Sequence, residues 1–313
     1  MSGSLVEIRK LTLGFAGVAV VRDIDIDLPA GKVTALIGES GSGKSLTALA
    51  LAGLLPKEAE VSGDIRWPGR TEAPQAGRDI GLVFQDPMSS LHPILSIGEQ
   101  VAEVLATHRP NGKRRWQDHR EGARALLDRV GIDGATSLAA YPHQFSGGMR
   151  QRVAIAMALA GDPELLIADE PTTALDVRTQ GRIVELLKTI GRERSLSLLL
   201  ITHDLALAAQ LADCIVVLYA GRVMEAGPLR RLLDNPRHPY TAGLIATSLD
   251  LGRPRTDLLP EIPGSLPQPG EQRDGCPFAP RCPKAGLPCR EMMPVWRGTI
   301  GDGVACHNAE AAA

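Results

Sequence analysis

An eight-residue loop pattern limits the folds open to this chain more than any other part of its sequence. Gly38–Ser45 match G-x-x-x-x-G-K-[ST] without a gap. Glycines in such a bend let several backbone N–H groups turn inward and form a nest for an anion, and the following helix adds the positive end of its dipole. Val33–Ile37, just before the loop, is a short apolar run typical of a buried strand. Strand, loop and helix in this order predict a phosphate-binding loop.

The residues of this loop have separate expected roles. Lys44 is expected to reach the outer phosphates as a point charge, and the Ser45 hydroxyl to ligate Mg²⁺. The backbone of the loop is expected to surround the phosphates. The complete set expected here is Gly38, Glu39, Ser40, Gly41, Ser42, Gly43, Lys44 and Ser45.

Two carboxylates end a second apolar run, at residues 165–168. Asp169 at the tip of this expected strand can hold the Mg²⁺ shell. Glu170 points differently and can polarise an attacking water. Gln85 ends another short apolar run, and its amide can contact Mg²⁺ or water. These side chains predict a metal-assisted hydrolytic site.

Ser146-Gly147-Gly148 precedes a helical run at residues 153–160 and resembles a second anion site. One nucleotide does not need two such sites from one chain, whereas two chains that face each other do. An ordinary serine cap is the alternative for this segment alone. His203 follows the apolar run at residues 198–201, where an imidazole can bind the γ-phosphate and orient water. Asp176 lies just past the acidic pair Asp169 and Glu170 and is expected to line a dimer interface.

Apolar runs alternate with helical patterns, which predicts an α/β core with a parallel sheet. Residues 96–160 have helical character, and a boundary is expected near residue 235, where proline and glycine become dense. The 313 residues are 44% hydrophobic, in the globular range, and the formal charge of −2 gives no support to nucleic-acid binding. The basic residues between 109 and 120 are expected to be solvated.

The sequence is also not expected to contain a targeting signal. The chain contains no apolar run long enough to span a bilayer. Its first residues lack a basic segment followed by an apolar core, so no secretory signal is expected. The sequence therefore predicts a protein that stays in the cytoplasm, and docking on a membrane protein remains open.

Taken in order, these motifs resemble the ATP-binding subunit of ABC transporters over residues 5–235. The resemblance implies a phosphate-loop, RecA-like ABC ATPase core at 1–235, with a helical subdomain at about 90–160. It implies that two subunits clasp two ATP molecules head to tail, with Mg²⁺ held by Ser45, Gln85 and Asp169. Glu170 would be the catalytic carboxylate and His203 the switch. The residues implied to bind nucleotide also include Phe15 against adenine and Leu46 through its N–H, and, from the opposite subunit, Ser146, Gly147, Gly148, Gln151 and Asp176.

Three further segments resemble the dipeptide, oligopeptide and nickel importer group: residues 145–152, 238–241 and 276–283. Met149 in the first of them resembles the D-type subunit, which implies a non-identical F-type ATPase partner. The resemblance also implies two membrane-spanning permease subunits, an indirect solute-binding protein outside the membrane, and a peripheral place on its cytoplasmic face. The implied function is ATP-driven import of peptides or a related small solute. The rival is a soluble ABC-type ATPase that acts on nucleic acid or ribosomes.

The expected C-terminal extension, 236–313, holds four cysteines: Cys276, Cys282, Cys289 and Cys306. They are separated by 5, 6 and 16 residues, so the tight C-x₂₋₄-C hook of most zinc sites is absent. A cytoplasmic chain disfavours disulfides. Four widely spaced thiols suit an iron–sulfur cluster, and related importer subunits carry one in a similar tail. A 4Fe–4S cluster is therefore expected, with zinc and no metal as the alternatives.

Overall fold

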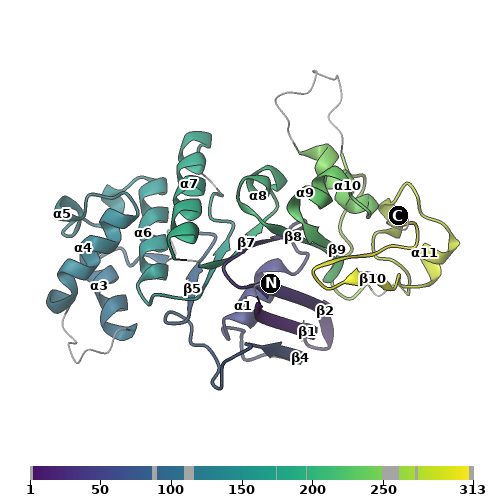
Figure 1. Cartoon of the computed structure of the whole chain (residues 1–313), viewed down its shortest axis with the longest axis horizontal. Coiled ribbons are helices and arrows are strands. Elements are labelled where there is room, and N and C mark those ends of the chain that lie inside the picture. Colours follow the sequence, from purple (N-terminus) through teal and green to yellow (C-terminus); the bar gives the residue numbers. More distant parts are fainter. Residues whose placement is uncertain are drawn as a thin grey trace. The chain divides into compact units, whose positions relative to one another are not determined.

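The computed structural model describes residues 3–86, 90–108, 116–173, 175–194, 196–248, 261–271 and 274–309. Its contacts divide the chain into two compact units. Unit 1 contains residues 1–51, 55–69 and 200–313, and unit 2 contains residues 52–54 and 70–199. Figure 1 colours the elements in chain order. No helix within the described ranges is both long and apolar enough to cross a membrane.

Unit 1 begins with a three-stranded antiparallel sheet. Its strands are β1 (Ser4–Phe15), β2 (Val18–Pro29) and β4 (Ala59–Arg66), in the order β2-β1-β4. Apolar side chains alternate along β1 and β2, and those that face inward are fully buried, Ile8, Leu11 and Leu13 among them. The alternation expected between residues 23 and 28 therefore gives a strand with one buried face.

The second sheet of unit 1 begins with β3 (Val33–Ile37), which lies parallel to β8 (Cys214–Tyr219). The order then continues antiparallel through β9 (Arg222–Pro228), β11 (Asp302–Ala305) and β10 (Trp296–Thr299). The hairpin of β10 and β11 was not expected from the sequence. It places the end of the C-terminal extension at the edge of the same sheet that carries β3.

The helices of unit 1 lie along this sheet and in the extension. They are α1 (Lys44–Leu51), α8 (Leu205–Leu211), α9 (Leu229–Asp234), α10 (Pro239–Thr247), the 3₁₀ turn η3 (Ala279–Arg281) and α11 (Leu287–Glu291). Side chains from β3, β8, α10 and the extension share one core. In this core, the ring centroids of Tyr219 and Tyr240 are 4.7 Å apart. The ring centroid of Phe278 lies 5.3 Å from that of Tyr219, and these two rings meet edge to face. Such aromatic pairs add stability beyond their buried area.

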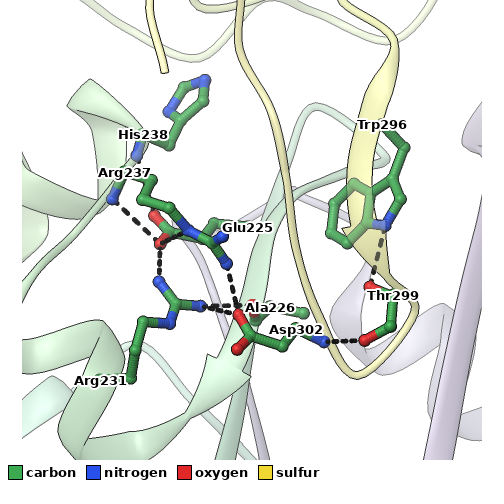
Figure 2. Close-up of polar contacts among 8 residues, drawn as sticks. All are labelled: Glu225, Ala226, Arg231, Arg237, His238, Trp296, Thr299 and Asp302. Carbon is green, nitrogen blue, oxygen red and sulfur yellow. Dashed lines mark hydrogen bonds and ion pairs between the residues drawn. The ribbon is translucent and has the colours of Figure 1, made fainter. Parts of the chain in front are cut away.

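A buried carboxylate holds the extension to the sheet (Figure 2). Glu225 on β9 is fully buried and accepts hydrogen bonds from the guanidinium of Arg231 and from the backbone N–H groups of Arg237, at 3.0 Å, and His238, at 2.9 Å. Arg231 also pairs with Asp302 on β11 at 3.0 Å, and Arg237 bonds the same carboxylate. Two arginines thus join β9, the start of α10 and the terminal hairpin.

Unit 2 contains the helical segment and two parallel strands. Strand β5 (Ile80–Val83) pairs with β6 (Leu165–Asp169) in parallel, with Val83 opposite Ala168. The helices are α3 (Ile97–His108), α4 (Arg120–Arg129), α5 (Gly134–Ser137), α6 (Gly147–Leu159) and α7 (Val177–Arg194), with 3₁₀ turns η1 (Trp116–His119) and η2 (Pro142–Gln144). The boundary between the units falls within β7 (Ser197–Thr202). The expected α/β fold and the helical segment are both present.

Candidate functional site

The phosphate-loop candidate follows β3 and leads directly into α1. A Cβ at position 38 would lie 2.2 Å from the carbonyl oxygen of Leu218, which is backbone and has no room to give. Gly43 has φ of +102°, and a Cβ there would lie 2.8 Å from a methyl of Val21. Both positions therefore require glycine for steric reasons. The loop is fixed by β2 and β8 before any ligand is considered.

Inside the loop, the ammonium of Lys44 donates to the carbonyl oxygens of Gly38, at 2.8 Å, and Glu39, at 2.9 Å. Lys44 is only 6% exposed. The Ser42 hydroxyl is fully buried and has no hydrogen-bond partner among the described residues. A buried cation and an unsatisfied hydroxyl at the start of a helix fit a phosphate group, which carries both charge and acceptor oxygens.

Four other residues expected to bind nucleotide also belong to unit 1. Ser45 is exposed at the first turn of α1, and Leu46 behind it is half-buried. Phe15 is half-buried at the end of β1. His203 is exposed after β7, and the next residue, Asp204, caps α8 by accepting the N–H of Ala206 at 2.8 Å.

Unit 2 brings together three polar side chains at the carboxyl ends of β5 and β6. One carboxylate oxygen of Glu170 accepts the amide of Gln85 at 3.1 Å and the hydroxyl of Thr173 at 2.8 Å. Glu170 has φ of +45°, which turns it away from the line of β6 after Asp169. A carboxylate held by two donors has a fixed orientation, and its second oxygen can polarise a water. Asp169 and Gln85 lie in this unit, whereas Ser45 belongs to unit 1.

The start of α6 forms a second polar cluster in unit 2. Ser146 caps the helix and accepts the N–H of Met149 at 3.4 Å. A Cβ on Gly148 would lie 2.1 Å from a methyl of Thr179, and Thr179 is held by Asp176 through its backbone N–H at 3.0 Å and its hydroxyl at 2.8 Å. The structure therefore places Ser146, Gly148 and Asp176 in one neighbourhood. These bonds hold the pKa of Asp176 below its ordinary value, the backbone N–H of Thr179 first.

Gln151 and Gly147 belong to the same expected cluster but differ in exposure. Gly147 is exposed beside Ser146. Gln151 is 1% exposed, and its amide nitrogen has no hydrogen-bond partner among the described residues. Its side chain thus faces the interior of unit 2. The basic residues at 109 and 113–115 lie outside the described residues.

The four cysteines of the extension lie near one another in unit 1, and none of them forms a disulfide. The backbone N–H of Cys276 donates to the carbonyl of Cys289 at 2.8 Å, so these two segments run side by side. Burial raises the pKa of the Cys276 thiol to about 11, and it also raises the pKa values of Cys282 and Cys306. Among the residues that the structure describes, no three His, Cys, Asp or Glu side chains are placed to hold a metal ion. The thiols as they stand do not form the ligand set expected for an iron–sulfur cluster.

The sequence did not predict two contacts that the extension makes with the phosphate loop. Arg281 from the extension donates to both carboxylate oxygens of Glu39 at 2.9 Å, and the hydroxyl of Tyr240 accepts the backbone N–H of Glu39 at 3.1 Å. These residues are more than 200 positions apart from the loop, and no local pattern joins them. The only signal in the sequence is an acidic residue inside a loop that suits anions.

The sequence of this chain matches two known families. The family described as ABC transporter matches residues 21–173, and the family described as oligopeptide/dipeptide transporter, C-terminal region, matches residues 224–289. A protein of Brucella abortus (strain 2308), named as a peptide import ATP-binding protein, is 43% identical over 96% of this chain and 94% of its own length.

Two solved structures share the fold. The ATP-binding cassette MJ0796, a dimer bound to ADP and Pi after hydrolysis, aligns with a TM-score of 0.61 at 28% identity, over 72% of this chain and 99% of its own. CbiO1 of Clostridium perfringens, part of the ABC transporter complex cbiONQ, aligns with a TM-score of 0.62 at 28% identity, over 74% of this chain and 91% of its own.

Proposed function

The chain belongs to the family of ABC transporter ATP-binding proteins, and we propose that it is the ATPase subunit that powers import of peptides or a related small solute. The single observation that carries this is the loop at Gly38–Ser45. There a buried ammonium and an unsatisfied hydroxyl are held at the start of α1 by backbone contacts that exclude any side chain at position 38. The match of residues 224–289 to the peptide-transporter extension supports peptides as the cargo class.

In the proposed site, the chain's own residues bind the nucleotide and position the water. Lys44 would leave the carbonyls of Gly38 and Glu39 for the outer phosphates. Ser45 and Asp169 would hold Mg²⁺, which would supply charge neutralisation on the transferred phosphate. Glu170, fixed by Gln85 and Thr173, polarises the attacking water, and His203 binds the γ-phosphate. The residues proposed to hold ATP with them are Phe15, Glu39, Ser40, Gly41, Ser42, Gly43 and Leu46.

A second ATPase subunit is proposed to complete the pocket. Ser146 and Gly148, beside Asp176, would cap the triphosphate bound by the opposite subunit, with Gly147 and Gln151 in the same segment. The start of α6 at Ser146 supports this, because the first turn of a helix and its dipole suit an anion. The companion is proposed to be a non-identical, F-type subunit. The assembly would sit on the cytoplasmic face of the membrane, on two permease subunits that receive solute from a binding protein outside.

A metal centre in the extension is proposed separately. Four cysteines on one short segment support an iron–sulfur cluster. Because burial raises the pKa values of the Cys276, Cys282 and Cys306 thiols, metal binding must release protons from them. Anaerobically purified protein should be brown and absorb broadly near ~400 nm. A colourless anaerobic sample with stoichiometric zinc would refute the cluster.

Co-purification tests the transport proposal. The tagged full chain should bring down polytopic membrane subunits and a second ATPase subunit from detergent-solubilised membranes. Recovery with ribosomes or DNA instead would support the soluble class of ABC ATPase and overturn the proposal.

A further inference from the structure

The strongest unassigned feature is the contact between the phosphate loop and the C-terminal extension, both in unit 1. Arg281 is 9% exposed and lies between two of the cysteines. Its Nε donates to the carbonyl of Pro263 at 2.6 Å, and one Nη to that of Ile262 at 3.1 Å. The guanidinium also stands over the rings of Tyr219, at 5.8 Å, and Phe278, at 6.0 Å. Backbone carbonyls and aromatic faces therefore hold this cation at one position.

The remaining Nη of Arg281 donates to both oxygens of Glu39, the second residue of the loop. The backbone of Glu39 is engaged as well: its N–H donates to Tyr240, and its carbonyl accepts Lys44 at 2.9 Å and the N–H of Ser42 at 3.2 Å. Glu39 thus connects Arg281 to the two loop residues that fit a phosphate.

The opposite charges of Arg281 and Glu39 give this ion pair a role in nucleotide binding. A carboxylate inside a loop that binds a triphosphate repels the ligand, unless a cation neutralises it. Arg281 supplies that cation at hydrogen-bonding distance, and Arg281 is buried while Glu39 is half-buried. The pattern G-x-x-x-x-G-K-[ST] does not require an acid at this position, so the acid and its distant partner are a matched pair.

Residues 266–269 of the extension also lie against the loop. Pro267, Gln268 and Pro269 line a pocket together with Gly41 and with Val20 of β2. A Cβ at Gly41 would stand 3.6 Å from Leu266, in ordinary contact. The extension therefore packs against the loop through residues 266–269 and also brings the positive charge of Arg281 to Glu39.

We propose that Arg281 is a positioning residue for ATP binding: by neutralising and fixing Glu39, it allows the loop to accept a triphosphate. This gives the extension a direct part in the nucleotide site. The inference rests on the proposed role of Gly38–Ser45 as the loop that holds ATP.

The test titrates the full chain with ATP and uses charge removal with rescue. Arg281→Gln keeps an amide donor near the carbonyls of Ile262 and Pro263 but loses the charge. It should raise the Kd for ATP on the order of tenfold, because an unneutralised carboxylate then faces the phosphates. The double variant Arg281→Gln/Glu39→Gln should return the Kd to within about threefold of wild type, since the repelling charge is gone. The loss should also shrink at high salt.

Arg297→Gln is the matched control, because Arg297 is an exposed arginine of the same extension. It should leave the Kd unchanged. If Arg281→Gln does not fold, Arg281→Lys and Glu39→Gln carry the test. The Kd of the lysine variant should lie between the wild-type value and the tenfold loss. Glu39→Gln keeps the backbone of position 39, through which the loop is proposed to hold ATP, and removes only the side-chain charge, so it should bind ATP at least as tightly as wild type.

Three results separate this inference from the proposed function. Weak binding by Lys44→Ala together with rescue of Arg281→Gln supports both. If Lys44→Ala binds weakly but Arg281→Gln is unchanged, or is not rescued by Glu39→Gln, the inference is wrong and the loop assignment stands. If Lys44→Ala binds ATP as tightly as wild type, the loop assignment itself fails, and the inference fails with it.

Discussion

Replacing Glu225 with glutamine should loosen the C-terminal extension from its sheet. One carboxylate oxygen accepts Arg231 and the N–H of Arg237, and the other accepts the N–H of His238. A glutamine turns one of these oxygens into an amide donor, so one buried N–H loses its acceptor whichever way the amide points. That costs about 1–3 kcal/mol, and the lost charge on the bond from Arg231 costs about 1.5–3 kcal/mol.

Together these terms give a loss of about 2.5–6 kcal/mol in the free energy of unfolding, which includes the range of about 3–5 kcal/mol found when a buried ion pair is broken. Urea denaturation of the full chain measures it, and hydrogen exchange in the β10–β11 hairpin should accelerate with it. Glu291→Gln, at an exposed position of the same extension, is the control and should stay within about 0.5 kcal/mol of wild type. A change of less than about 1 kcal/mol in Glu225→Gln would refute the idea that this carboxylate anchors the extension.

Three other outcomes are expected. Lys44→Ala should weaken ATP binding by at least about tenfold, measured by titration. The substitution removes the ammonium that donates to the loop carbonyls in this structure and is proposed to bind the outer phosphates. Gly148→Val should destabilise unit 2 by about 1–3 kcal/mol in thermal unfolding, since its side chain would overlap Thr179; an unchanged melting temperature would contradict this. Burial lowers the pKa of His238 from 6.5 to about 4, so the unfolded chain binds a proton that the folded chain does not. Stability from this group is complete above pH 6.5 and falls as the pH drops toward 4, by about 2 kcal/mol at pH 5; His238→Asn, which can still accept the N–H of Tyr240, should lose that part of the slope.

Local chemistry made the central elements predictable. The run at residues 33–37, the glycines of the loop and the acidic pair after residue 168 each carry their signal within about ten positions. The structure confirms a strand, a loop and a helix at Val33–Leu51, and a strand that ends at Asp169. The hydrogen bond between Gln85 and Glu170 follows from the parallel pairing of β5 with β6, which places two strand ends together.

The extension was the least predictable part, for a physical reason. Its contacts join residues that are far apart in sequence: Arg281 with Glu39, Arg231 with Asp302, and Phe278 with Tyr219. Short strands such as β10 and β11 have little periodicity of their own and form because β9 offers an open edge. The spacing of the cysteines predicted a metal centre, but spacing cannot report how far burial favours the protonated thiol.

Hydrolysis by Glu170→Gln tests the account most directly. The variant and the wild-type chain are each assembled with their membrane subunits, and ATP turnover and ATP binding are measured on the same samples. Turnover should fall at least about a hundredfold, because no carboxylate polarises the water, while the Kd for ATP changes little. Turnover at the wild-type rate would contradict the assignment of this residue and, with it, the proposed mechanism.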